Sequence, residues 1–189
     1  MDRKTIDKLL ITAGILLSIM LFAAAGFAYW GQKFADNQIK SLLVQEEIFF
    51  PVKGDPALDP KTFPGLQQYA GQQVDNGVKA KAYANEYIWA HMMKASGGQT
   101  YAQVSAAAKA NPTDLKLAGL KNTLFQGDML RSSLLTAYAF SVFGLIAQWA
   151  TIVFVIGGGI MFILVLLGIN HFMYKTNGAK KARTLKKKK

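Results

Sequence analysis

The sequence contains no cysteine and only two histidines among its 189 residues. Without cysteine the chain has no disulfide, no thiolate metal site, no covalently attached haem and no cysteine nucleophile. The histidines, His91 and His171, are separated by a long hydrophobic run. Because the topology argued below places them on opposite sides of a membrane, an iron site with two histidines and one carboxylate is excluded.

Recognisable catalytic patterns are also missing. Glu46 and Glu47 are adjacent and would diverge in an extended segment, which gives weak support for paired-carboxylate catalysis. The glycine run 157–159 is not followed by Lys and Ser/Thr at the spacing of a phosphate-binding loop. We therefore predict a non-enzymatic protein with no catalytic, cofactor-binding or metal-binding residues. The enzymatic alternative is a site centred on His91 with one acidic neighbour, Glu86, Glu46 or Glu47.

Charged residues are absent from two long segments. The first runs from Leu9 to Trp30, and as a helix its 22 residues would measure about 33 Å, enough to cross the apolar core of a bilayer. The second runs from Ser132 to Tyr174, and its most apolar part begins at Trp149. We predict transmembrane helices at 9–30 and 149–174. The lack of charge within them argues against an ion or proton pathway through this chain alone.

Basic residues instead gather beside the two predicted spans. The net charge is +11, and the segment from Lys175 onward holds eight basic and no acidic residues. An excess of Lys and Arg marks cytoplasmic flanks, so residues 1–8 and 175–189 are predicted to be cytoplasmic. The tail lacks stacking aromatics and a recognition fold, so we predict contact with membrane lipid and no nucleic-acid binding. The residues assigned to topology and lipid head groups are Lys180, Lys181, Arg183, Lys186, Lys187, Lys188 and Lys189.

An alternative reading of the N-terminus is a cleaved signal peptide. The small residues of 23–25 and 26–28 satisfy a cleavage rule after a basic start and an apolar stretch. The uncharged run is longer than the usual apolar region of a signal peptide, which favours a retained span. Cleavage would leave one span with its N-terminus outside.

The segment 31–148 lies between the spans and is predicted to form a small helical extracytoplasmic domain. Few stretches alternate between apolar and polar residues, so a sheet is not expected. Residues 32–44 continue the first helix, and a strap at 48–65 holds four of the five prolines. Because proline fixes its own φ angle and restricts its predecessor, we expect the strap to be extended, with Ile48, Phe49 and Phe50 docked on the core or the membrane surface.

Helix start and stop signals divide the rest of the domain. The predicted helices are one from Asp75 or Asn76 to about Ala95, stopped at 96–98; a second capped by Thr100 with Gln103 and ended before Asn111-Pro112; and a third from Thr113 to Gly127. The expected core positions are Tyr83, Tyr87 and Met93 on the first of these helices and Leu117, Leu120 and Leu124 on the third.

The last helix is predicted to begin at Asp128 and to continue from the domain into the second span. Large side chains recur at intervals of three and four, the seam by which one helix packs on another. Small residues at 157–159 and 23–26 offer surfaces for close approach within the membrane. The predicted seam consists of Leu135, Tyr138, Val142, Leu145, Trp149 and Ile152.

The segments IFFP (48–51), YAGQQV (69–74), AKAYANEYI (80–88), TYAQVSAAAKANP (100–112) and LFQGDMLRSSLLTAYAF (124–140) occur in this order between the two hydrophobic runs. In this the chain resembles a family of two-span actinobacterial envelope proteins over most of its length. The resemblance implies a multi-pass protein of the plasma membrane and supplies no catalytic residues. Some members are called aromatic ring-opening dioxygenases, but His91 alone cannot build the iron site of such an enzyme.

The aromatic residues of the domain are the candidates for recognition. We predict an accessory or scaffold subunit of a cell-envelope complex, bound to another membrane or envelope protein or to copies of itself. The alternative is a ligand-binding or sensory module for a lipid, a quinone or a cell-wall fragment, held in an apolar groove between helices. The candidate partner contacts are Phe49, Phe50, Tyr83, Tyr87 and Trp89, for which filling the core is an open alternative.

Overall fold

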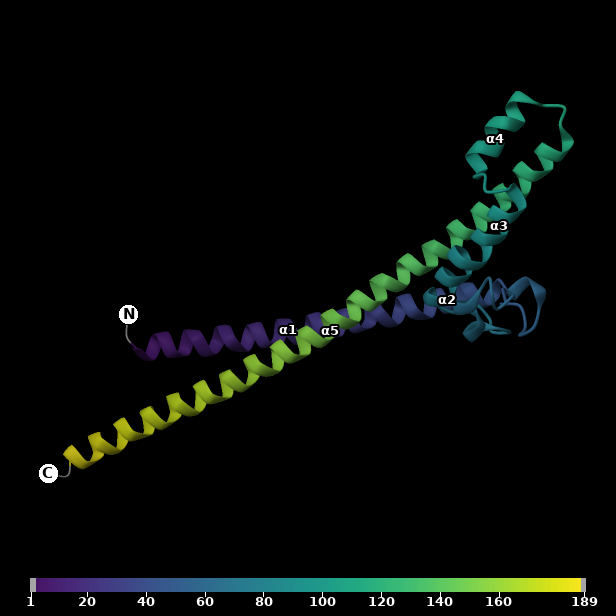
Figure 1. Ribbon diagram of the computed structural model, residues 1–189. Coiled ribbons are helices and arrows are strands. Elements are labelled where there is room, and N and C mark those ends of the chain that lie inside the picture. Colours follow the sequence, from purple (N-terminus) through teal and green to yellow (C-terminus); the bar gives the residue numbers. More distant parts are fainter. Residues whose placement is uncertain (1–2, 188–189) are drawn as a thin grey trace. The chain divides into compact units, whose positions relative to one another are not determined.

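The computed structural model describes residues 3–187, with side chains described as far as Asn177, and its regular elements are all helices (Figure 1). The tail residues assigned to lipid contact are therefore outside the described side chains, and Lys188 and Lys189 are outside the described residues altogether. In chain order the elements are α1 (Arg3–Gln45), the 3-10 helices η1 (Pro56–Leu58) and η2 (Pro64–Tyr69), α2 (Gly77–Ala82), the π-helix η3 (Tyr83–Ile88), α3 (Trp89–Ser96), α4 (Tyr101–Ala110) and α5 (Leu115–Lys187).

The all-helical prediction is confirmed for the described part of the chain, where the one β feature is an isolated bridge between Phe49 and Gln73. The chain forms two compact units. The helix-pair unit comprises Met1–Gln32 with Ile146–Lys189, and the middle unit comprises Lys33–Leu145. Each is described by itself below.

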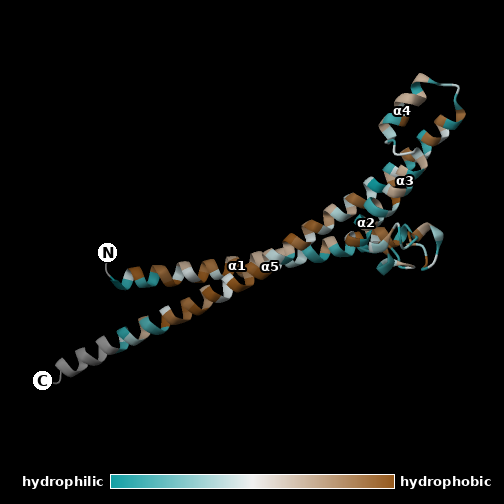
Figure 2. Ribbon diagram, in the orientation of Figure 1, coloured by the Kyte–Doolittle hydropathy of each residue, from teal (hydrophilic) through white to brown (hydrophobic). Residues whose placement is uncertain are grey.

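Two helices, α1 and α5, are long and apolar enough to cross a membrane. Figure 2 shows the hydrophobic bands that they carry. Within the helix-pair unit large apolar side chains point outward, and Trp149, for example, is 63% exposed. A helix from the core of a soluble protein would hide most of such surface, whereas an apolar solvent accommodates it.

Small residues bring the two helices of the helix-pair unit together in antiparallel fashion. A Cβ atom added to Gly14 would lie 2.7 Å from Val165 Cγ2, and one added to Gly158 would lie 3.1 Å from the Phe22 ring. Ser18 is buried and its hydroxyl donates to the Gly158 carbonyl at 3.3 Å. The buried and half-buried positions follow a heptad spacing: Ile11, Gly14, Ser18, Leu21, Ala25 and Ala28 on α1, and Thr151, Phe154, Gly158, Met161, Val165 and Gly168 on α5.

The predicted seam of large residues on the last helix is confirmed only in its first half. Leu135, Tyr138 and Val142 are half-buried, and Leu135 packs against the core. Leu145, Trp149 and Ile152 are exposed, and the fully buried positions of α5 are instead Leu134, Gly144 and Gly158 among others. Large residues at heptad positions fill the contact between helices in water, but helices in an apolar medium gain more by placing small residues at the contact. Among the small residues predicted for close approach, Gly158 and Ala25 are buried, while nothing lies within 4 Å of a Cβ added to Gly159 or Gly26.

The core of the middle unit gathers apolar residues from every element of that unit. The strap is a series of turns with two short 3-10 helices rather than a fully extended segment, because several of its apolar residues turn inward. Of the three residues expected to dock, Phe50 is buried, Ile48 is half-buried, and Phe49 faces outward. The buried core comprises Ile39, Leu43, Phe50, Leu58, Phe63, Leu66, Val74, Ala80, Ala82, Ala84, Ile88, Met92, Val104, Leu124 and Leu134.

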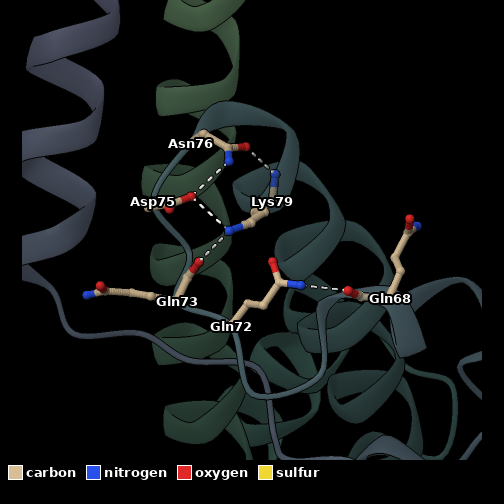
Figure 3. A network of polar contacts seen from close by, with 6 residues as sticks. All are labelled: Gln68, Gln72, Gln73, Asp75, Asn76 and Lys79. Carbon is tan, nitrogen blue, oxygen red and sulfur yellow. Dashed lines mark hydrogen bonds and ion pairs between the residues drawn. The ribbon is translucent and has the colours of Figure 1, made fainter.

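Several predicted helix ends are confirmed by their hydrogen bonds. The Asn76 side chain accepts from the Lys79 amide at 3.0 Å, and Asp75 pairs with Lys79 at 3.0 Å (Figure 3). Gly97 ends α3 in the left-handed conformation, with φ of 64°. Thr100 and Gln103 form the expected reciprocal capping box at the start of α4.

Other predicted boundaries are wrong. Asp114, rather than Thr113, caps α5, because its carboxylate accepts from the Leu117 amide at 3.0 Å. Gly127 does not end a helix, and Asp128 does not begin one, since α5 continues through both. A Cβ atom at Gly127 would lie 2.6 Å from Met92 Sδ, so this glycine permits the close approach of α3. Met92 is accordingly buried, rather than the predicted Met93.

Candidate functional site

An apolar groove lies between α1 and α5 on the surface of the middle unit. It has a volume of about 580 Å³. Ile39, Leu43 and Leu134 are buried along it, while Phe34, Leu42 and Phe140 are exposed. The lining residues are Phe34, Ala35, Gln38, Ile39, Leu42, Leu43, Glu46, Ile48, Leu130, Ser133, Leu134, Thr136, Ala137 and Phe140.

The spacing of the lining residues explains the groove. On α1 they follow two rows at intervals of four, and residues four apart lie one above the other on a helix. One row packs inward through Ile39 and Leu43, and the other, which includes Leu42, stands as a wall. On α5 the wall includes Leu130 and Phe140.

The groove offers few polar partners to a ligand. The hydroxyl of Ser133 donates to the Met129 carbonyl at 3.1 Å, and that of Thr136 donates to the Ser132 carbonyl at 2.9 Å. Both hydroxyl protons are thus engaged within α5. Glu46 is the single charged residue of the lining. A mainly apolar occupant therefore fits this groove, since a polar one would lose its hydrogen bonds to water without replacement.

A second feature is a cluster of aromatic rings beside the strap. Tyr83, Tyr87 and His91 follow one another at intervals of four along η3 and α3, with centroid separations of 4.8 Å and 4.3 Å. The Phe50 ring packs edge-on against Tyr83 at 5.0 Å, and the Phe63 ring stacks on His91 at 5.4 Å. The cluster packs the strap against the helices.

Arg131 of α5 braces the π-helix that carries part of this row. Its Nε donates to the Ala84 carbonyl at 3.0 Å, and that carbonyl also accepts from the Trp89 amide. A second guanidinium nitrogen donates to the Asn85 side chain at 3.2 Å, and the group lies over the Trp89 ring at 4.4 Å. Wide π turns are often found at functional sites, and here the bend is held by side-chain contacts from another helix.

The five predicted partner contacts have different environments. Phe50 is 1% exposed and belongs to the core, so it is not a surface contact. Tyr83 and Tyr87 are half-buried in the aromatic cluster. Trp89 has one face covered by Arg131, and Phe49 is 53% exposed. Phe49 is thus the most accessible of the five.

The histidine proposed for the enzymatic alternative is engaged in packing. His91 Nδ1 donates to the Tyr87 carbonyl at 2.8 Å, and its ring lies between Phe63 and Tyr87. Among the described residues, no ion pair or hydrogen bond connects His91 to Glu46, Glu47 or Glu86. No group of three or more His, Cys, Asp or Glu residues able to hold a metal ion is found among the described residues.

Comparisons with protein-family models, with curated proteins and with solved structures found no match to this chain. The resemblance to two-span envelope proteins stays a prediction. The functional argument accordingly starts from the groove.

Burial gives the aromatic cluster a pH dependence that can be measured. It raises the pKa of Tyr83 to about 12 from its ordinary value of 10.0, and Tyr87 adds to the shift. Between these pH values the unfolded chain loses the phenol proton while the folded chain keeps it. The free energy of unfolding should therefore fall as pH rises from 10 to 12. Above pH 12 Tyr83 should contribute little further change.

We expect Tyr83→Phe to remove this part of the alkaline destabilisation. The measurement is the unfolding midpoint of the detergent-solubilised protein across that pH range, together with phenolate absorbance. Tyr101→Phe on α4 removes one phenol elsewhere and serves as the control. An unchanged pH profile in Tyr83→Phe would show that Tyr83 is not the source.

Proposed function

We propose that the chain is a two-span protein of the plasma membrane with both termini in the cytoplasm and the middle unit outside. The two helices long and apolar enough to cross a membrane support the spans. The basic residues before the first apolar run and after the second support the orientation. A retained first span is part of this proposal.

For the middle unit we propose a non-enzymatic role as a binding module for a lipid-like amphiphile. The observation that carries the proposal is the groove of about 580 Å³, whose volume lies within the roughly 300–1,000 Å³ of small-molecule sites. Lipids, prenylated quinones and lipid-linked cell-wall fragments share a long apolar chain. Covering the exposed Phe34, Leu42 and Phe140 with such a chain would remove apolar surface from water.

The second candidate function is that of an accessory or scaffold subunit. A different observation favours it, because Phe49 and Val52 of the strap are 53% and 65% exposed. Neither lines the groove. Aromatic residues exposed in this way are common at protein interfaces, so a partner protein would be expected on the strap while the groove takes a ligand.

The test of the ligand function is mild detergent extraction followed by native mass measurement and identification of every bound lipid and protein. We expect a lipid-like species to be bound to the wild-type protein. Ser133→Trp fills the groove and should weaken binding of this species by about tenfold or more, where tenfold corresponds to about 1.4 kcal/mol. Ser132→Trp is the matched control, because Ser132 is the adjacent serine and lines a separate shallow hollow with Asp128 and Arg131.

The outcomes separate the two candidates. A bound lipid that Ser133→Trp does not displace would exclude the groove as its site. A reproducible protein partner that is lost from Phe49→Ala and kept by Ser133→Trp would instead support the accessory role. A chain recovered alone, with neither ligand nor partner, would oppose both functions.

A further inference from the structure

The charge of the groove is confined to one of its ends. Glu46 follows directly after the last residue of α1 and is twelve residues beyond Phe34, which corresponds to about 18 Å at the rise of a helix. The Phe34 end includes Phe140 of α5 and has no charged lining residue. An occupant with an apolar body and a polar terminus would match this asymmetry.

The Glu46 end of the groove carries two adjacent carboxylates. Glu47 follows it directly, both residues are exposed, and α1 has no basic residue in its last turn. The carbonyl groups at the C-terminus of a helix add partial negative charge. The ion pairs found among the described residues, Lys79 with Asp75 and Arg131 with Asp128, leave both glutamates without a paired cation.

The two carboxylates favour an occupant whose polar end is positively charged. We infer that the groove takes the hydrocarbon chain of an aminolipid, with the ammonium of the head group beside Glu46 and Glu47. This inference rests on the proposed function of the groove. A head group that carries phosphate alone would be repelled by the two carboxylates, whereas an ammonium donates charge-assisted hydrogen bonds to them.

The proposed topology agrees with this orientation. Along the chain, Phe34 is one helical turn beyond Trp30, where the first predicted span ends. Glu46 is further from the span. The order along the chain, from span to apolar end to Glu46, is also the order from acyl chain to head group in a lipid of the outer leaflet.

The test compares two lipids with identical acyl chains. The full-length protein is exchanged into nanodiscs that contain phosphatidylethanolamine and phosphatidylglycerol in equal amounts, and the lipids retained after gentle extraction are counted by native mass spectrometry. We expect a preference of about two- to fivefold for phosphatidylethanolamine, the effect of one exposed ion pair. The double variant Glu46→Gln/Glu47→Gln should bind both lipids about equally, and Glu86→Gln should behave as the wild type.

Folding does not obscure this comparison, because removing negative charge from a helix C-terminus favours the helix. Suppose that Ser133→Trp releases both lipids. If the wild type then shows no preference for phosphatidylethanolamine, or if the double variant keeps that preference, the aminolipid inference is wrong and the proposed function stands. If Ser133→Trp releases neither lipid, both fail. A wild-type dimer that Ser133→Trp dissociates would assign the groove to a second copy and overturn the inference.

Discussion

Replacing Phe50 with alanine should lower the free energy of unfolding of the middle unit by about 3 to 5 kcal/mol, the usual loss for a buried phenylalanine. Phe50 is 1% exposed, and its ring contacts those of Tyr69 at 5.3 Å and Tyr83 at 5.0 Å. Truncation leaves a cavity between the strap and η3, lined by rings that cannot all move inward together. Protection from hydrogen exchange, resolved to peptides of the middle unit, measures the change.

Phe49→Ala is the matched control for this prediction. The two phenylalanines are adjacent, and the bridge between Phe49 and Gln73 makes the backbone locally extended, so their side chains point to opposite sides. Because Phe49 is half-exposed, its truncation should cost less than about 1 kcal/mol. Equal losses in the two variants would mean that the strap is not anchored through Phe50.

The sequence predicted those parts of the fold that depend on neighbouring residues alone. A capping box is completed within four residues, and the bonds between Thr100 and Gln103 form as expected. The Asn76 cap and the left-handed Gly97 likewise need no distant partner. Local chemistry of this kind also predicted the inward-facing Leu124 on α5.

Predictions failed where a distant segment decides the outcome. Glycine after an amphipathic stretch usually ends a helix, but Gly127 instead accommodates Met92 from α3, a contact that sequence spacing does not show. Sequence spacing also does not show that Arg131 Nε of α5 donates to the Ala84 carbonyl of the π-helix η3. Of the partner candidates Phe49 and Phe50, one is buried. Which one could be decided only once the side of the strap that faces the core was known.

The groove itself was anticipated only as a class of site. The alternative function named an apolar groove between helices, but none of its lining residues was identified. The i, i+4 rows from Phe34 to Glu46 are visible in the sequence. Such a row lines a groove only where a second helix leaves it partly uncovered, and the sequence does not show this. The sequence also did not show where Glu46 and Glu47 lie. They were considered there as catalytic carboxylates, whereas the structure places them directly after the end of α1, at one end of the groove.

The seam prediction fails at Trp149 and Ile152 in the helix-pair unit, where glycines rather than large residues form the contact between the helices. Gly158→Leu should disrupt the pairing of α1 and α5, since the Phe22 ring lies 3.1 Å from the position of its Cβ. Overpacking of this kind costs about 1 to 3 kcal/mol, and displacing the helix would also break the Ser18 hydrogen bond to the Gly158 carbonyl. Gly159→Leu adds the same side chain one residue away, where nothing lies within 4 Å of the added Cβ.

The absence of cysteine makes this pairing directly measurable, because two cysteines can be introduced without competing thiols. Gly14→Cys with Val165→Cys tests a contact in which the Gly14 Cβ position is 2.7 Å from Val165 Cγ2. In membranes we expect oxidation to cross-link this double-cysteine protein and its Gly159→Leu derivative to the same extent. The Gly158→Leu derivative should cross-link at least about fivefold less, because a loss of about 1 kcal/mol or more in pairing free energy corresponds to that factor. If Gly158→Leu and Gly159→Leu cross-link alike, small residues at this face do not determine the pairing, and the heptad of large residues would have to be reconsidered as the contact.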